Sequence, residues 1–187
     1  MPAFFLTLLA CLLVTAASRE QLRVARLSAA LGAGTGLFVA IGLSSIVTSA
    51  VAAWAGWLIA PSMAGAAKQM FVALALILGA VELAFLRSGP VPKEPTRSVG
   101  AIALVLFFKQ LTDASRFLVL GFSVVTGDPY LAAAGGALGS GAALCIAVMA
   151  GAEWEARVPV RKLALGLAAV LFVAAIFTGL SARGILG

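Results

Sequence analysis

Long apolar stretches alternate with short polar segments along the whole chain. The apolar stretches fall near residues 3–17, 28–58, 69–86, 99–126, 130–151 and 163–182. A helix that crosses a bilayer needs about 20 residues with a rise of about 1.5 Å each. The pattern therefore predicts an all-α integral membrane helical bundle of about six transmembrane helices.

The composition favours a membrane protein, because charged side chains are too few to cover a soluble domain. Of the 187 residues, 63% are hydrophobic and 11% are charged. The net charge of +6 is also typical of proteins that bind nucleic acid. Here, however, the basic residues lie between the apolar stretches, as membrane orientation requires. We therefore predict that the partner of this protein is the lipid bilayer around it, and that it does not bind nucleic acid.

The positive charges lie mainly on one side of the predicted bundle. The other side has only Lys68 and Arg183. Nine basic residues follow the first, third and fifth stretches, namely Arg19, Arg23, Arg26, Arg87, Lys93, Arg97, Arg157, Arg161 and Lys162. By the positive-inside rule these three segments are cytoplasmic and both termini lie outside. We expect a multi-pass protein of the cell (inner) membrane.

A proline-rich segment divides the chain near its middle. We predict a first three-helix repeat over residues 1–87, a cytoplasmic linker over residues 88–98 and a second three-helix repeat over residues 99–187. Three helices in each half place the halves in opposite orientations. This is the arrangement of inverted repeats in many secondary transporters.

Two short matches favour an internal repeat. Residues 15–19 (TAASR) match residues 112–116 (TDASR) in four of five positions, and residues 34–36 (GTG) match residues 139–141 (GSG). The first pair is offset by 97 residues and the second by 105, which predicts about eight extra residues near Gly127. Small residues in these segments also predict that the second and fifth stretches pack centrally.

The fourth stretch carries a polar cluster at residues 109–116 (KQLTDASR), with apolar residues on both sides. A charge in the middle of a bilayer costs at least about 2.5 kcal/mol, so it normally faces the bundle interior. Lys109 and Asp113 are four residues apart, and Asp113 and Arg116 are three apart. A continuous helix would place all three side chains on one face.

Two interpretations of this cluster are open. In the first, Asp113 binds a cation or carries a proton, and neutral oxygens assist it. Those oxygens would come from Gln110, Thr112 and Ser115. In the second, Lys109, Asp113 and Arg116 form a self-neutralised ladder that only packs this helix against the first one.

The first stretch supplies a matching element. Thr15 and Ser18 correspond to Thr112 and Ser115 in the repeat, so we place them on the same ion pathway. The helix then continues through a basic stripe, in which Arg19 is the nearest charge partner of the cluster. This stripe is interpreted as an anchor among anionic headgroups or, alternatively, as an electropositive vestibule.

Glu82 is the other carboxylate inside an apolar stretch. It lies near the end of the third stretch. We consider two roles for it: a place on the ion pathway, or an ion pair with Arg87 at the membrane surface.

The repeat positions resemble a known family. Residues 110–115 (QLTDAS) are similar to the motif Glu-x-Gly-Asp-(Lys/Arg)-(Ser/Thr) of the cation–proton exchangers that handle manganese and calcium, within the wider LysE-like superfamily of exporters. Asp113 and Ser115 match this motif, whereas its glutamate, glycine and basic residue are replaced. In the first copy, residues 13–18, only Ser18 matches.

The resemblance implies inverted three-helix repeats and exchange of a divalent cation, such as manganese or calcium, for protons, with Asp113 as a metal ligand. We therefore expect a small secondary transporter or exporter whose ion is cargo, and no bound cofactor. The alternative is a non-transporting membrane subunit or scaffold with a structural Lys–Asp–Arg cluster. No nucleotide-binding or catalytic motif occurs, so we predict no enzyme. Homodimerisation is left open.

Overall fold

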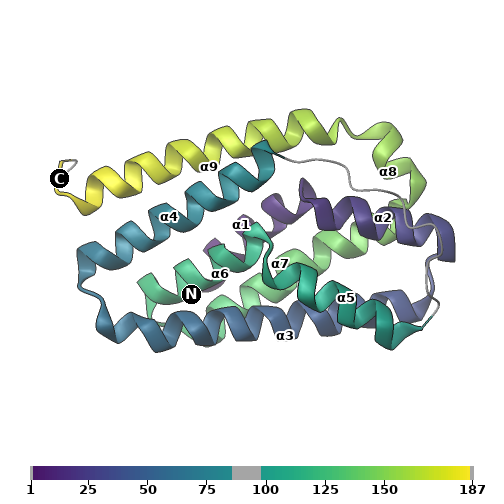
Figure 1. Cartoon of the computed structure of the whole chain (residues 1–187), viewed down its shortest axis with the longest axis horizontal. Helices are drawn as coiled ribbons and strands as arrows, with labels where there is room; N and C mark the ends of the chain where they lie inside the picture. The colour runs from purple at the N-terminus through teal and green to yellow at the C-terminus, as the bar shows by residue number, and fades with distance from the viewer. Residues whose placement is uncertain (1, 86–97, 186–187) are drawn as a thin grey trace.

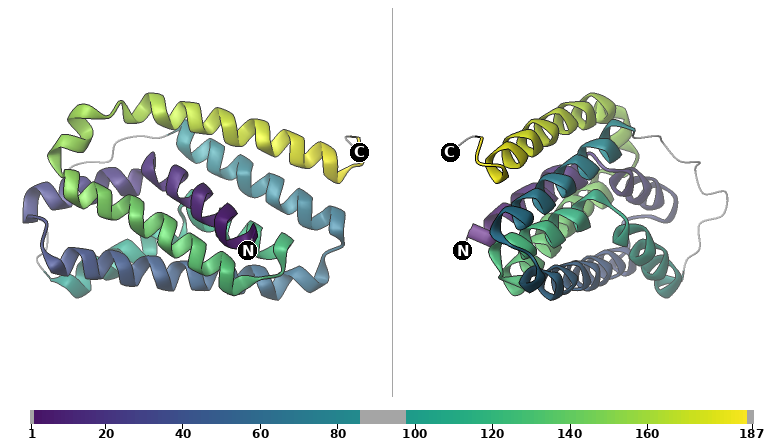
Figure 2. Two further views of the ribbon diagram at one scale, coloured as in Figure 1. Left: turned by 180° about the vertical axis from the view of Figure 1, so that it is seen from behind. Right: turned by 60° about the vertical axis from the view of Figure 1, so that its left-hand side comes forward.

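The computed structural model describes residues 2–85 and 98–185, which form a bundle of helices (Figure 1). The described helices are α1 (Pro2–Ala16), α2 (Arg19–Leu31), α3 (Thr35–Ile59), the 3₁₀ turn η1 (Ala60–Ser62), α4 (Gly65–Ala84), α5 (Val99–Leu111), α6 (Ala114–Thr126), α7 (Pro129–Ala150), α8 (Ala152–Arg157) and α9 (Val160–Ala182). Seen from other sides, α4 and α9 lie together along one edge of the bundle (Figure 2).

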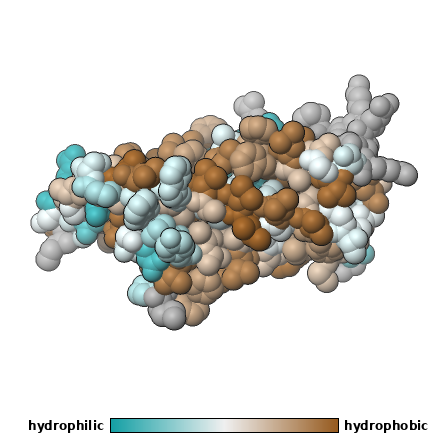
Figure 3. Space-filling model, turned by 90° about the horizontal axis from the view of Figure 1, so that it is seen from below, coloured by the Kyte–Doolittle hydropathy of each residue, from teal (hydrophilic) through white to brown (hydrophobic). Residues whose placement is uncertain are grey.

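Four of the described helices are long and apolar enough to cross a membrane: α3 with η1, α4, α7 and α9. A fifth crossing results if α1 and α2, which meet at a bend of 61°, count as one span. Apolar side chains cover the middle of the face in Figure 3, and hydrophilic ones gather toward its ends. The structure thus agrees with a membrane helical bundle. Helices α5 and α6 are apolar but shorter.

Helix α7 lies in the middle of the bundle, where it packs against both α1 and α3. The contact between α3 and α7 agrees with the central packing predicted for the second and fifth stretches. Gly135 and Gly139 on α7 face α1, and a Cβ atom at Gly139 would overlap the backbone carbonyl oxygen of Leu8. Glycine therefore lets the two helix backbones approach closely, as in other membrane bundles.

We expect Gly139→Ala to destabilise the fold by about 1–3 kcal/mol, because the added methyl group has to push α1 and α7 apart. The measurement is thermal unfolding of the purified protein in detergent. Gly141→Ala is the matched control on the same helix, because its Cβ atom would lie 3.9 Å from the Cβ of Ser45, an ordinary contact. Equal melting temperatures for the two variants would contradict this packing.

Two helices that the sequence predicts as continuous are broken instead. The first breaks between α1 and α2, where Ser18 caps α2 by accepting a hydrogen bond from the Gln21 amide at 3.4 Å. The fourth breaks between α5 and α6, where Asp113 caps α6. Serine and aspartate are strong N-cap residues, since their side chains accept bonds from the first free amides of a helix. The basic residues from Arg19 to Arg26 consequently lie within α2 and not in a loop.

The order of the helices repeats at a register that differs from the predicted one. Helices α2, α3 and α4 begin at residues 19, 35 and 65, and α6, α7 and α9 begin at residues 114, 129 and 160, each 94 or 95 residues later. Residues 34–36 open α3, whereas residues 139–141 lie in the middle of α7, so the predicted match between them is wrong. The predicted insertion near Gly127 is absent as well, because only residues 127 and 128 separate α6 from α7.

The predicted linker separates α4 from α5. Helix α4 ends at Ala84 and α5 begins at Val99. Of residues 88–98, all but Ser98 lie outside the described residues, and so do the basic residues Arg87, Lys93 and Arg97. The division into residues 1–87 and 99–187 stays a prediction.

Candidate ion site at the two helix breaks

A pocket of about 380 Å³ lies beside the two helix breaks. It is lined from the start of α2, from α4, from the α5–α6 junction and from the first turn of α6. The lining residues are Arg19, Glu20, Arg23, Leu78, Val81, Glu82, Lys109, Thr112, Asp113 and Phe117. Three carboxylates and three basic side chains therefore meet in one space between otherwise apolar helices.

Asp113 occupies this pocket because it is the N-cap residue of α6. Its Oδ2 atom accepts hydrogen bonds from the Ser115 hydroxyl at 2.6 Å and from the Ser115 amide at 3.4 Å. Only 3% of the residue is exposed. The N-terminus of a helix carries a partial positive charge, which stabilises a carboxylate placed there. The break thus gives Asp113 a fixed position at the start of α6.

Glu82 on α4 lines the same pocket as Asp113. Its carboxyl group interacts with the Asp113 carboxyl group and with the backbone N–H of Ala114. Two adjacent carboxyl groups repel each other when both are ionised. A proton or a cation between two such groups would remove that repulsion.

In the described part of the chain, none of the three basic residues of the pocket forms an ion pair with Asp113. Arg23 forms an ion pair with Glu20. Arg19 donates from Nη2 to the carbonyl oxygen of Phe85 at 3.2 Å, and its charge also attracts the Glu82 carboxylate. Lys109 is exposed in the last turn of α5.

Arg116 is buried behind Asp113, with 2% of its surface exposed. Its Nε atom donates to the Thr48 hydroxyl at 2.7 Å, and Nη2 donates to Oε1 of Gln110 at 3.0 Å. Both terminal nitrogens reach the Ser140 hydroxyl, at 3.1 and 3.2 Å, and Nη1 also reaches the Ser115 hydroxyl at 3.4 Å. Neutral oxygens from α3, α5, α6 and α7 thus satisfy the guanidinium group.

The predicted Lys–Asp–Arg ladder does not form. Because the helix ends at Leu111 and restarts at Ala114, Lys109 and Asp113 do not share one continuous helical face. Arg116 points toward α3 and α7, and neither it nor Lys109 forms an ion pair with Asp113 in the described part of the chain. Ser115 links the two charges instead, since it donates to Asp113 and accepts from Arg116.

The other predicted site residues separate into two groups. Gln110 and Ser115 are buried with Arg116, so their oxygens serve the guanidinium group and do not face the pocket. Thr112 lines the pocket, and its hydroxyl donates to the Lys109 carbonyl at 3.2 Å.

Thr15 and Ser18 do not line the pocket. Thr15 is buried and its hydroxyl has no hydrogen-bond partner among the described residues, whereas Ser18 caps α2. Ser18 immediately precedes α2 as Asp113 immediately precedes α6, so these two residues occupy equivalent positions at the breaks. By the same count Gln21 is equivalent to Arg116. The predicted correspondence of Ser18 with Ser115 is therefore shifted by two residues. Gln21 is fully buried, and within residues 2–85 and 98–185 neither of its side-chain amide atoms has a hydrogen-bond partner.

Sequence reasoning missed three members of the arrangement: Glu20 in the pocket, and Thr48 and Ser140 around Arg116. Glu20 lies two residues after the capping Ser18, and this cap signal indicates a new first turn there. Thr48 stands in a run of hydroxyl residues in the middle of α3, within an otherwise apolar helix. Its importance follows only from contact with a residue 68 positions away.

No cluster of three or more histidine, cysteine, aspartate or glutamate side chains placed to hold a metal ion occurs among residues 2–85 and 98–185. Comparisons with models of protein families, with characterised proteins and with solved structures find no match to this chain. The resemblance to the manganese and calcium exchangers therefore rests on the motif residues alone.

Proposed function

We propose that the protein is a small secondary transporter that exchanges a cation for protons at the pocket lined by Asp113 and Glu82. The observation that supports this function most strongly is the pair of interacting carboxyl groups at a helix break. Ionisable residues inside a membrane are costly, and they commonly mark ion or proton pathways. Neither Asp113 nor Glu82 forms an ion pair with a basic residue among the described residues.

The broken helices support the same proposal. Helices interrupted near the middle of the membrane form the ion sites of many secondary transporters, because their free backbone ends face the ion. Here α5 ends at Leu111, two residues before Asp113. In the proposed cycle, a cation binds between Asp113 and Glu82 on one side of the membrane and is replaced by a proton on the other.

We also propose that each broken helix pair makes one crossing, which gives six crossings in two inverted halves of three. The regular spacing between the starts of α2, α3 and α4 and those of α6, α7 and α9 supports this arrangement. With six crossings the two termini share one side, and the positive-inside rule puts that side outside the cell membrane.

The cargo of the proposed transporter is a cation that two carboxylates are able to hold. A divalent ion such as calcium takes six to eight oxygen ligands, so manganese or calcium would need several waters or backbone oxygens in addition to Asp113 and Glu82. We therefore assign the exchange of a cation for protons and leave the choice of ion to direct measurement.

The test is transport in proteoliposomes with a pH gradient across the membrane. Purified protein is reconstituted, and uptake of Na⁺, K⁺, Ca²⁺ and Mn²⁺ is followed together with internal pH. We expect at least one cation to accumulate while protons leave, and no such exchange in protein-free liposomes. If none of the four ions moves faster than in protein-free liposomes, the transporter proposal is wrong and the scaffold alternative gains support.

A further inference from the structure

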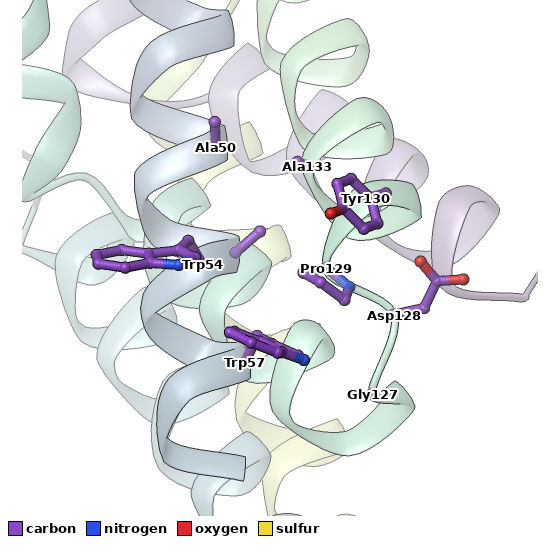
Figure 4. A pocket seen from close by; sticks show the side chains of 9 residues that line it. Ala50, Trp54, Trp57, Gly127, Asp128, Pro129, Tyr130 and Ala133 are labelled. Atoms are coloured by element: carbon purple, nitrogen blue, oxygen red, sulfur yellow. The ribbon is translucent and has the colours of Figure 1, made fainter.

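A second pocket, of about 580 Å³, lies at the opposite end of the bundle from α8, between the last turns of α3 and the turn from α6 to α7 (Figure 4). It is separate from the carboxylate pocket, with which it shares no residue. Its lining consists of Ala50, Ala53, Trp54, Trp57, Gly127, Asp128, Pro129, Tyr130 and Ala133.

Aromatic residues, Pro129 and three alanines make up most of the lining of this pocket. Trp57 and Pro129 stand next to each other across the space, with Tyr130 at the rim (Figure 4). These aromatic rings are not covered by other described parts of the protein: Trp57 is 47% exposed and Tyr130 is 85% exposed. Tryptophan and tyrosine favour the membrane–water interface, where a ring contacts hydrocarbon and its polar atom contacts water.

The charge of the pocket lining determines which lipid headgroups the pocket favours. Asp128 is the only charged residue in its lining. Asp128 also caps α7, since its Oδ1 atom accepts a hydrogen bond from the Leu131 amide at 3.1 Å. A negative rim beside aromatic faces attracts an ammonium group by charge and by cation–π interaction, and it repels an anionic headgroup.

We propose that this pocket binds a phospholipid with an ammonium headgroup, such as phosphatidylethanolamine. The ammonium group lies at the rim, against the ring of Tyr130 and beside the Asp128 carboxylate. One acyl chain lies on the trough formed by Ala50, Ala53 and Ala133, where small side chains leave room for it. This inference is independent of whether the protein transports an ion.

The test uses quenching of tryptophan fluorescence by lipids with brominated acyl chains. A Trp154→Phe background removes the one tryptophan outside this pocket, which lies on α8. The protein is reconstituted in mixtures of phosphatidylethanolamine and phosphatidylglycerol in which only one lipid is brominated. We expect quenching to show a preference of roughly fivefold for phosphatidylethanolamine.

Two variants locate the preference in the pocket. Tyr130→Ala removes an aromatic wall, and Asp128→Asn removes the charge while asparagine still caps α7. We expect each variant to lower the preference at least twofold. Equal quenching by both lipids, a preference for phosphatidylglycerol, or a preference that both variants leave unchanged would overturn the proposal. Protection of the tryptophans from both lipids in a dimeric protein would place a second copy over the pocket and would also overturn it.

Discussion

Asp113→Asn is expected to abolish cation–proton exchange and to leave the fold intact. Asparagine is nearly isosteric with aspartate, it is an equally good N-cap residue, and its oxygen still accepts the hydrogen bond that Ser115 donates. What the substitution removes is the charge and the site for a proton. The measurement is exchange in proteoliposomes, which we expect to fall to the level of protein-free liposomes.

A surface carboxylate provides the control for Asp113→Asn. Glu153 is exposed on the short helix α8 and does not line the pocket. We expect Glu153→Gln to retain the exchange rate of the unmodified protein. Folding of both variants is checked by their melting temperatures in detergent. A folded Asp113→Asn variant with undiminished exchange would remove Asp113 from the transport mechanism.

Arg116→Met is expected to cause the largest loss of stability among single substitutions at the breaks. Methionine fills much of the same space but donates no hydrogen bonds. The hydroxyls of Thr48 and Ser140 and the amide oxygen of Gln110 would lose the donor that joins α3, α5, α6 and α7. A hydrogen bond to a charged group contributes about 1.5–3 kcal/mol. We expect unfolding free energy to fall by about 3 kcal/mol and Tm to fall by roughly 10 °C.

Arg116→Lys separates the effect of charge from that of geometry. Lysine keeps the positive charge but offers three donors on one atom, and it cannot reach all four helices as the guanidinium group does. We therefore expect an intermediate Tm, between those of the unmodified protein and Arg116→Met. If Arg116→Met melts within about 2 °C of the unmodified protein, Arg116 does not join these helices, because the loss of one kcal/mol alone shifts Tm by about that amount.

The apolar pattern alone is enough to predict the helical membrane bundle. Stretches of Leu, Val, Ala and Phe leave no exterior suited to water, and α3, α4, α5, α6, α7 and α9 lie largely within those stretches. The small residues of α7 were likewise sufficient to predict its close packing, because glycine at 135 and 139 has few other uses in the middle of an apolar helix. These features depend on composition and periodicity, which a sequence displays directly.

The helix breaks were not predicted, because residues that favour a helix continue on both sides of them. Ser18 and Asp113 were interpreted as polar residues inside continuous helices, although both are typical N-cap residues. A serine within a helical sequence does not by itself decide between a break and a continuous helix. Its side chain is able to cap a new helix or to form a hydrogen bond with a backbone carbonyl of its own helix. The choice at these positions depends on the neighbouring helices, which bury Ser18 and Asp113 at the junctions.

The partners of Asp113 and Arg116 follow from the fold and not from local spacing. Spacing of three and four residues suggested that Lys109, Asp113 and Arg116 neutralise one another, but the break turns them apart. The actual partners, Glu82 for Asp113 and Thr48 for Arg116, lie on α4 and α3. Such contacts between distant parts of a chain are visible only once the helices are placed.

Cation–proton exchange at Asp113 requires that the pocket beside it is open to water inside the membrane-spanning bundle. Cysteine labelling tests this directly, after Cys11 and Cys145 are replaced by alanine. Thr112→Cys places a thiol in the pocket lining. Leu104→Cys places one on the exposed apolar surface of α5, because Leu104 is 58% exposed. With a charged, water-soluble methanethiosulfonate, we predict rapid modification at position 112 and little at position 104. A thiol at position 112 that reacts as slowly as the one at position 104 would contradict a hydrated site beside Asp113.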